Sequence, residues 1–430
     1  MHLGPQKTYP PRYLLGYAFS YGASLDTRLK NQFIGNYVFA LHRIREYNHN
    51  TTSFGYAWFI QSFFYALVCN AIVADAMGVR ASRLAHILST IYTVSFLFPV
   101  IVHWVWSTEG WLSAIRPENV EPVGTIGAID FAGSGVVHML GGVISLAASI
   151  FLRKAEAPKA PAEDQLSLTL GGFLRVFAMY SFVTGSTIAI TLGSSGAMTL
   201  DSNVISALGG LTPAIIATDG NDMPMFVAAG RAAVCLTLSI AASALAVLLL
   251  ESFLSKEVNL THGVNGLTVG FAAISSNILT CEPWAALIAG LVGGMIYVFG
   301  RRMFKGLRDN DVFVIHGLGG FWGLMFTACL AKPKFIRDVI GYNFYPNRVA
   351  IGRALGGNFG GQVLGLTPFT RQGGVFYPKK GPNGKLLGTM LLESVAVFMW
   401  GLVMALPLFG ILAAMKKLQA VPAKEAAADK

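Results

Sequence analysis

Ile129-Asp-Phe-Ala-Gly-Ser-Gly-Val-Val-His-Met-Leu-Gly-Gly-Val143 is the stretch that decides the fold, because it places an acid and a histidine in otherwise apolar sequence. Apolar side chains continue to Leu152, so Asp130 and His138 lie within a run of about 20 residues, the length that crosses a bilayer. Ionisable groups at such depth are costly and usually mark a path for ions or protons. The stretch therefore predicts a membrane protein with a permeation or proton path.

A second stretch repeats the local pattern around the histidine. Val314-Ile-His-Gly-Leu-Gly-Gly320 resembles Val-Val-His-Met-Leu-Gly-Gly over 136–142, so His138 and His316 lie in matching frames 178 residues apart. A lone histidine in a membrane helix is often a packing residue, but a duplicated frame favours a shared role. Histidine can relay a proton near neutral pH and stay neutral in an apolar wall. We expect the two imidazoles to share a hydrogen bond.

The composition places most of the chain in lipid. Hydrophobic residues make up 53% of the sequence and charged residues 13%, against about 25% charged in soluble proteins. The apolar runs are too long for barrel strands of about 10 residues, so we expect an all-α polytopic bundle. Nine full spans are predicted, at 54–75, 84–106, 129–152, 167–195, 227–253, 263–281, 283–300, 312–331 and 386–414.

The chain 1–430 is predicted to form one membrane domain of two pseudo-repeat halves. Each half carries one histidine element in its last span, which is typical of duplicated transporters. The first half begins with a partial span, because the apolar run from Tyr13 to Gly22 is too short to cross alone. The expected parts are a first half over 1–152, a polar linker over 153–166, a second half over 167–331, a long loop over 332–385, the last span over 386–414 and a tail over 415–430.

The net charge of +10 is interpreted as topology and not as a nucleic-acid site. Lys and Arg gather in the loops 76–83 and 301–311, in the linker and in the tail, whereas 107–128 and 196–226 are mainly acidic. The positive-inside rule then places the C-terminus in the cytoplasm. The loop 332–385 does not follow the positive-inside rule, because it lies on the predicted outer side and holds nine Lys or Arg and one acid.

Asp130-Phe-Ala-Gly-Ser-Gly-Val-Val-His138 resembles the signature of the ammonium transporter family (Amt/Mep/Rh), and most of all its plant-type branch. The resemblance extends from about Leu14 to Lys417. The family has eleven helices, of which this chain lacks the first and most of the second. Further blocks agree in order, among them Pro99-Val-Ile-Val-His-Trp-Val-Trp106, Gly270-Phe-Ala-Ala-Ile274, Pro283-Trp-Ala-Ala286 and Gly384-Lys-Leu-Leu-Gly388.

The resemblance implies a homotrimer with a narrow hydrophobic pore in each subunit. His138 and His316 match the family's pair of pore histidines, and Asp130 matches a conserved acid that we expect to hold the backbone at the mouth. We therefore expect ammonium or ammonia as the substrate, the lipid bilayer and further copies of the chain as partners, and a multi-pass location in the plasma membrane. We expect no enzymatic activity, cofactor, metal or nucleic-acid partner.

The resemblance also implies a capture site and a gate. Trp106 matches the aromatic residue of the family's outer cation site, and Ser186 matches a hydroxyl there. Trp is the best cation-π partner, at roughly 0.5 to 2 kcal/mol. The stacked phenylalanines of the gate match Phe182 and Phe64, with Phe63 or Tyr65 as alternatives to Phe64. Beyond such a gate the charged ion is unfavourable, so the ion is expected to split into a proton and a neutral amine.

Two other functions stay open at this stage. His138 and His316 could be the axial ligands of a haem in a redox protein. The helices that we expect to be missing, and Val183-Thr184 where the family has an Asn beside the gate phenylalanine, would instead suit a truncated homologue that senses ammonium or does not conduct it. Glu393, an acid in the last predicted span, could be structural or could line the cytoplasmic vestibule.

Overall fold

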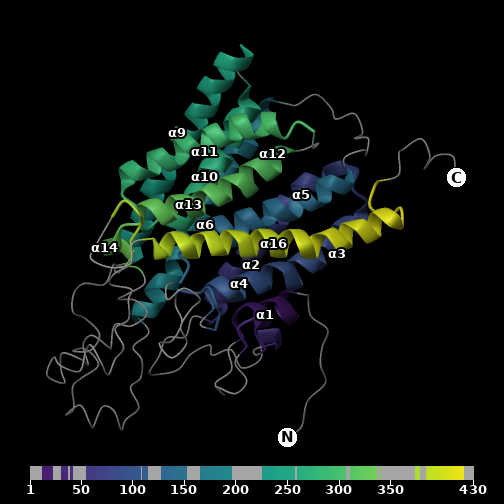
Figure 1. Cartoon of the computed structure of the whole chain (residues 1–430), viewed down its shortest axis with the longest axis horizontal. Coiled ribbons are helices and arrows are strands. Elements are labelled where there is room, and N and C mark those ends of the chain that lie inside the picture. Colours follow the sequence, from purple (N-terminus) through teal and green to yellow (C-terminus); the bar gives the residue numbers. More distant parts are fainter. Residues whose placement is uncertain are drawn as a thin grey trace, which may run out of the picture.

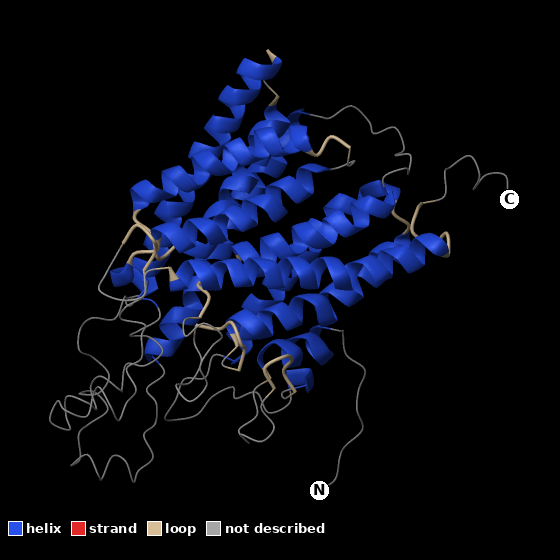
Figure 2. Cartoon of the chain, viewed as in Figure 1, coloured by secondary structure: helices blue, strands red, loops and turns tan. Residues whose placement is uncertain are grey.

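A computed structural model describes residues 12–22, 31–36, 39–41, 55–107, 109–114, 127–152, 165–195, 225–256, 259–306, 310–336, 339, 373–377 and 384–420. Within these residues the regular structure is helical (Figure 2). Eight helical segments are long and apolar enough to cross a membrane. The predicted all-α polytopic bundle is therefore confirmed. The long loops 196–224 and 340–372, with the acidic and basic side chains predicted there, lie outside the described residues.

The membrane-length segments are built from one helix or from two joined helices. They are α2 (Gly55–Met77); α3 (Arg83–Tyr92) and α4 (Phe98–Trp106), joined by a π-helix (Thr93–Leu97); α5 (Leu140–Leu152) after a π-helix (Ser134–Met139); α6 (Gln165–Ser195); α9 (Met225–Ser255); α11 (Pro283–Met303); α13 (Gly319–Leu330) after a π-helix (Phe313–Leu318); and α16 (Lys385–Ala414). Shorter helices are α1 (Tyr17–Tyr21), α10 (Leu260–Ile274), α12 (Asn310–Val312) and α14 (Pro333–Ile336).

The predicted span 263–281 differs most from its structure. Here α10 has 15 residues and ends in a 3-10 turn over Ser275–Asn277, short of the roughly 20 residues that cross a bilayer. The helix ends early because Ser276 of the turn forms hydrogen bonds with other segments of the chain. Ser276 donates its hydroxyl to the carbonyl oxygen of Ile129 at 2.6 Å and its amide to the hydroxyl of Ser134 at 2.7 Å.

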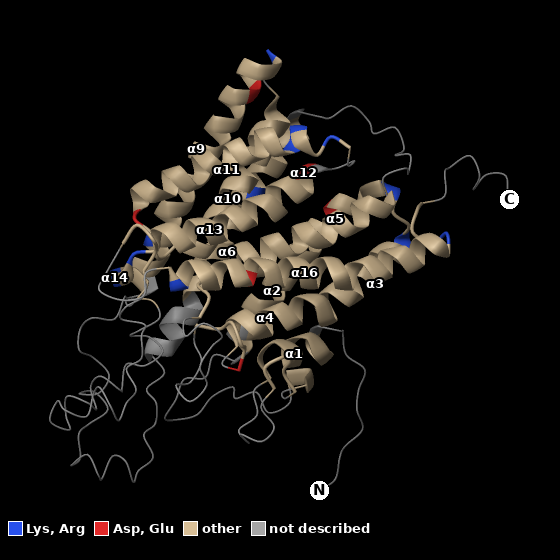
Figure 3. Cartoon of the chain, viewed as in Figure 1, with Lys and Arg blue, Asp and Glu red and all other residues tan. Residues whose placement is uncertain are grey.

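The helices of the two halves lie side by side, with α16 along their boundary. In Figure 1 the first half runs from purple to blue, the later helices are green, and the yellow α16 packs against both α5 and α13. Figure 3 shows that Lys, Arg, Asp and Glu lie mainly near the ends of the helices. This charge distribution leaves the middle of the bundle apolar, as a membrane-spanning domain requires.

Glycines let the two histidine elements cross at close range. A Cβ atom on Gly142 would lie only 2.2 Å from the backbone nitrogen of Gly317. One on Gly320 would lie 2.3 Å from the carbonyl oxygen of Ser134. Small residues allow membrane helices to approach in this way. The repeated Leu-Gly-Gly after each histidine thus brings the two elements together at the same depth.

Candidate functional site

Asp130 shapes the backbone that presents His138. Its carboxylate oxygen Oδ2 accepts hydrogen bonds from the amides of Gly135 at 3.0 Å and Val136 at 2.9 Å, which caps the first helical turn. Gly133 has a φ of +84°, a conformation that favours glycine, and the helix begins at Ser134 and not at residue 129 as predicted. The geometry agrees with the structural role expected for Asp130.

His138 and His316 face each other across the boundary between the halves. Their Nδ1 atoms are 3.0 Å apart, and the ring planes are within 3° of parallel with centroids 5.2 Å apart. The predicted hydrogen bond is confirmed. Because an Nδ1-to-Nδ1 bond needs one donor and one acceptor, the two neutral rings must be opposite tautomers. One ring then presents a bare Nε2 and the other an Nε2 that carries a proton.

A continuous series of aromatic rings leads from Trp106 to the histidines. The ring centroids are 5.1 Å apart from Trp106 to Tyr65 and 4.8 Å from Tyr65 to Phe182. They are 5.4 Å apart from Phe182 to Phe271 and 4.8 Å from Phe271 to His138. The last three of these contacts are edge-to-face, so the edge of one ring packs against the face of the next without an open gap between the pairs.

Hydrogen bonds hold the Trp106 end of this series. Trp106 donates its Nε1 proton to the carbonyl oxygen of Asp130 at 2.7 Å, which fixes the indole and leaves its faces available. Tyr65 donates its hydroxyl to Ser186 at 2.5 Å, and Ser186 donates to the carbonyl oxygen of Phe182 at 2.8 Å. The Ser186 oxygen keeps one lone pair for a further donor.

Phe64 lies elsewhere than expected for a gate residue. Its side chain is 53% exposed and contacts the ring of Phe63, whereas Tyr65 is 2% exposed and stands between Trp106 and Phe182. Successive residues of a helix point about 100° apart, so a shift of one position exchanges the inner and outer faces of α2. The structure thus favours Tyr65, an alternative that the sequence had left open.

Phe271 received no role from the sequence, although it lies in a block that carried the resemblance. Its ring is buried and bridges Phe182 and His138. An aromatic residue inside the Gly270-Phe-Ala-Ala run was a signal, because every neighbour in that run is small or aliphatic. The run alone does not tell which way the ring points.

Glu393 is buried beside Asp130. The point that a Cβ on Gly135 would occupy lies 2.9 Å from Glu393 Oε1 and 3.2 Å from Asp130 Oδ2. Within the described residues, neither oxygen of Glu393 has a hydrogen-bond partner, and neither does Asp130 Oδ1. Glu393 therefore packs against the acid that caps the His138 helix.

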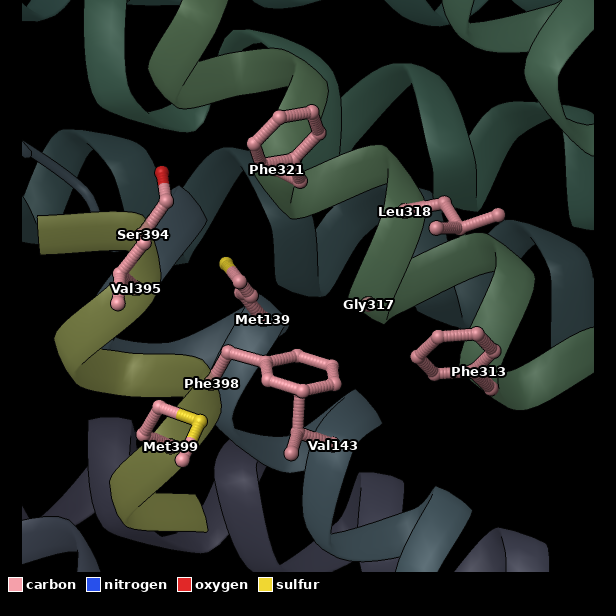
Figure 4. Close-up of a pocket in the computed structure, with 10 residues that line it drawn as sticks. All are labelled: Met139, Val143, Phe313, Gly317, Leu318, Phe321, Ser394, Val395, Phe398 and Met399. Carbon is pink, nitrogen blue, oxygen red and sulfur yellow. The ribbon is translucent and has the colours of Figure 1, made fainter. Parts of the chain in front are cut away.

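An apolar cavity of about 300 Å³ lies behind the histidine elements (Figure 4). Met139 and Gly317, the residues that follow the two histidines, line it together with residues of α5, α13 and α16, and Ser394 supplies its polar side chain. Neither histidine lines it. The cavity offers little to a cation, so the ring series that ends at His138 is the better candidate for a conduit.

The stacked histidines do not fit a haem held between them. Axial ligands bind on opposite faces of a porphyrin, but these rings lie 5.2 Å apart with their Nδ1 atoms already hydrogen-bonded to each other. Within the described ranges, no three His, Cys, Asp or Glu side chains group closely enough to hold a metal ion.

Comparisons with known proteins agree with the resemblance in the sequence. The chain matches the model of the Ammonium Transporter Family over residues 13–229 and 219–430. Ammonium transporter 1 member 1 of Arabidopsis thaliana is 30% identical over 418 residues, which cover 95% of this chain and 71% of that protein. Ammonium transporter 1 member 2 of Oryza sativa subsp. japonica is 30% identical over 368 residues, which cover 82% of this chain and 66% of that protein. The match therefore spans about two thirds of the rice relative's length.

Two solved structures share the fold. Mep2 of Saccharomyces cerevisiae superimposes with a TM-score of 0.66 at 19% identity, over 96% of this chain and 76% of that one. A sensor Amt protein superimposes with a TM-score of 0.65 at 19% identity, over 96% of this chain and 84% of that one.

Proposed function

Because this chain belongs to the ammonium transporter family, we propose that it carries ammonium across a membrane. The observation that supports this function most directly is the aromatic series that runs from Trp106 to a hydrogen-bonded histidine pair. That series ends at two imidazoles whose ring nitrogens can accept and donate protons. A multi-pass membrane protein with such a path suits a small cation that can lose a proton.

Capture takes place beside Trp106. An ammonium ion against the indole face gains cation-π attraction of roughly 0.5 to 2 kcal/mol, and the free lone pair of Ser186 accepts one of its N–H groups. Both groups are already held by other hydrogen bonds, Trp106 to Asp130 and Ser186 to Phe182. The site is therefore ordered before the ion arrives, which lowers the entropy cost of binding.

Tyr65 and Phe182 form the gate. Their rings touch edge to face, and Phe182 and Phe271 repeat this arrangement one step further in. A hydrated ion is too large for such a passage, and stripping its water in an apolar tube is costly. The ion therefore gives up its proton to the histidine pair at the inner end of the ring series, and the neutral amine continues alone.

The histidine pair receives that proton or orients the amine. A bare Nε2 can accept a proton or an N–H, and a protonated Nε2 can donate to the lone pair of the amine. When the bare Nε2 accepts a proton, the proton in the Nδ1-to-Nδ1 bond moves to the other ring, and that ring releases the proton on its own Nε2. The pair is then neutral again with the two roles exchanged. His138 and His316 thus act as one unit.

The assembly and orientation belong to the same proposal. When α10 and its 3-10 turn, which follow α9 and pack against α9 and α11, are counted as a ninth crossing, the charge pattern of the loops favours the Trp106 end outside and the C-terminus in the cytoplasm of a plasma membrane. The family resemblance implies a homotrimer, and large apolar side chains on the surface of α6 suit burial against another subunit. They include Leu170, Phe173 and Phe177, each at least 58% exposed.

Growth of a yeast strain that lacks its own ammonium permeases, with ammonium as the nitrogen source, tests the function. We expect the full chain to restore growth and uptake. The variants His138→Ala and His316→Ala should each abolish uptake, because the conduit loses its proton-exchanging unit. His86→Ala is the matched control, since the ring of His86 bonds the carbonyl oxygen of Gly78 at 2.9 Å and has no contact with the ring series among the described residues.

The result that would overturn the proposal is a wild-type protein that reaches the plasma membrane in normal amount and carries no ammonium. Ligand binding without uptake, measured on the same purified protein, would then support the sensor alternative.

A further inference from the structure

Arg175 lies on the face of α6 that lines the conduit. It precedes Met179, Phe182 and Ser186 by 4, 7 and 11 residues, the spacing that keeps side chains on one face of a helix. Phe182 belongs to the gate and Ser186 to the capture site. Arg175 therefore continues the same stripe on the other side of the gate from Trp106, about 16 Å from Ser186 along the helix axis.

The contacts of Arg175 place it just past the histidine pair. Its Nη1 atom donates to the hydroxyl of Thr268 on α10 at 3.0 Å. Thr268 lies about one turn before Phe271, whose ring touches His138. The guanidinium interacts electrostatically with the imidazole of His316, and also with the carboxyl of Asp75 on α2.

Exposure changes along this stripe. Met179 is 3% exposed and Phe182 is 8% exposed, whereas the side chain of Arg175 is exposed. Because α6 packs against both α2 and α10, Arg175 lies where these three helices meet, and it bonds Thr268 of α10. No carboxylate lies within ion-pair distance of Arg175 in the described part of the chain. The charge is thus not neutralised by contact.

Building on the proposed function, we propose that Arg175 is a specificity-determining residue, a fixed positive charge past the histidine pair that turns back cations and admits the neutral amine. A guanidinium stays protonated under all conditions in which proteins fold, so the charge cannot be titrated away. A fixed arginine beside a narrow passage is an electrostatic barrier to cations. Amine that has left its proton at the histidines passes this barrier without penalty, whereas ammonium, K⁺ and Na⁺ are repelled.

Two substitutions separate the charge from the shape. The full chain is reconstituted in lipid vesicles, and the fluxes of ammonium and K⁺ are measured on the same preparations. Arg175→Gln removes the charge, and the ratio of K⁺ flux to ammonium flux should rise on the order of tenfold. Arg175→Lys keeps the charge, and this ratio should stay at the wild-type value. Equal thermal unfolding temperatures of the two variants show that the comparison is between folded proteins.

A chemical rescue provides a second measurement. Arg175→Cys should also raise the K⁺ ratio, and a cationic methanethiosulfonate reagent should lower it again, whereas the neutral methyl reagent should not. The wild-type chain treated with the same reagents controls for its own cysteines, which are buried at Cys69, Cys235 and Cys281 and partly exposed at Cys329.

The outcomes distinguish the two proposals. If the wild type transports ammonium and the Gln and Cys variants keep its selectivity, Arg175 is only an anchor and this inference is overturned while the transport function stands. If the wild-type chain passes no ammonium in the same vesicles, the transport function fails, and this inference fails with it.

Discussion

At the scale of single residues, the pairing of Glu393 with Asp130 is the least expected arrangement. Two carboxylates this close in a buried site repel each other, and one of them normally keeps its proton. Asp130 accepts two backbone amide hydrogen bonds, which favour its charged form, so we expect Glu393 to be the protonated member. A proton on Glu393 also supplies the hydrogen that the unpartnered oxygens lack.

Glu393→Gln tests this assignment. The neutral amide can donate to Asp130 as the carboxylic acid would, so we expect the free energy of unfolding to stay within about 1 kcal/mol of the wild type or to rise. Thermal unfolding of the purified protein in detergent measures it. Ser394→Ala, one residue along α16, is the control, because Ser394 bonds only its own helix at Met390. A loss for Glu393→Gln well beyond that of the control would show that the negative charge of Glu393 is needed.

At the scale of elements, a polar network joins α10, α11 and α12 near the start of α10. Arg301 donates to Nε2 of His262 at 2.7 Å, and Nδ1 of His262 lies 3.0 Å from the hydroxyl of Tyr297, which donates to Asp311 at 2.9 Å. An arginine can only donate, so Nε2 must be bare and His262 must be neutral. Asp311 lies in α12, which directly precedes the π-helix that carries His316.

This network should weaken in acid. Burial, together with the neighbouring Arg301, lowers the pKa of His262 from its usual value. The unfolded chain therefore takes up a proton at His262 before the folded chain does, and stability falls as the pH drops below the unfolded pKa of about 6.5. We expect the unfolding temperature to decrease between about pH 7.5 and 5.5, and His262→Gln to make this decrease shallower. An identical pH profile for the two proteins would contradict the prediction.

At the scale of the whole molecule, the crossing of the two halves holds the histidines together. Gly142 and Gly317 allow backbone contact there, and a Cβ at Gly142 has no space beside the Gly317 nitrogen. The positions of His138 and His316 thus depend on Gly142 and Gly317, neither of which belongs to the ring series.

Gly142→Ala should push the halves apart. We expect a loss of stability of about 1 to 3 kcal/mol and a clear drop in ammonium uptake, because the distance between the two Nδ1 atoms must grow. Gly388→Ala is the matched control, since a Cβ on Gly388 in α16 would meet nothing within 4 Å. Thermal unfolding and uptake measured on both variants check the prediction. Equal effects at the two glycines would show that helix propensity, not the crossing, decides the outcome.

The sequence by itself determined the helical membrane fold and the partnership of His138 with His316. Length and apolar composition select membrane helices irrespective of neighbours, and a repeated frame places its two histidines at equivalent depths. The sequence also indicated Trp106, Ser186, Phe182 and Asp130 through the family resemblance, and the roles of these residues stay predictions.

Only the tertiary structure decided which neighbouring side chain joins the ring series and what each charged group in the bundle contacts. The rotation and packing of helices distant in sequence decide that Tyr65 and not Phe64 joins the ring series, and that Phe271 bridges Phe182 and His138. They also decide where Arg175 and Glu393 lie. In lipid a helix can be apolar on every face, so periodicity carries little information about which face is inside. Contacts between helices supply that information, and they exist only once the bundle has assembled.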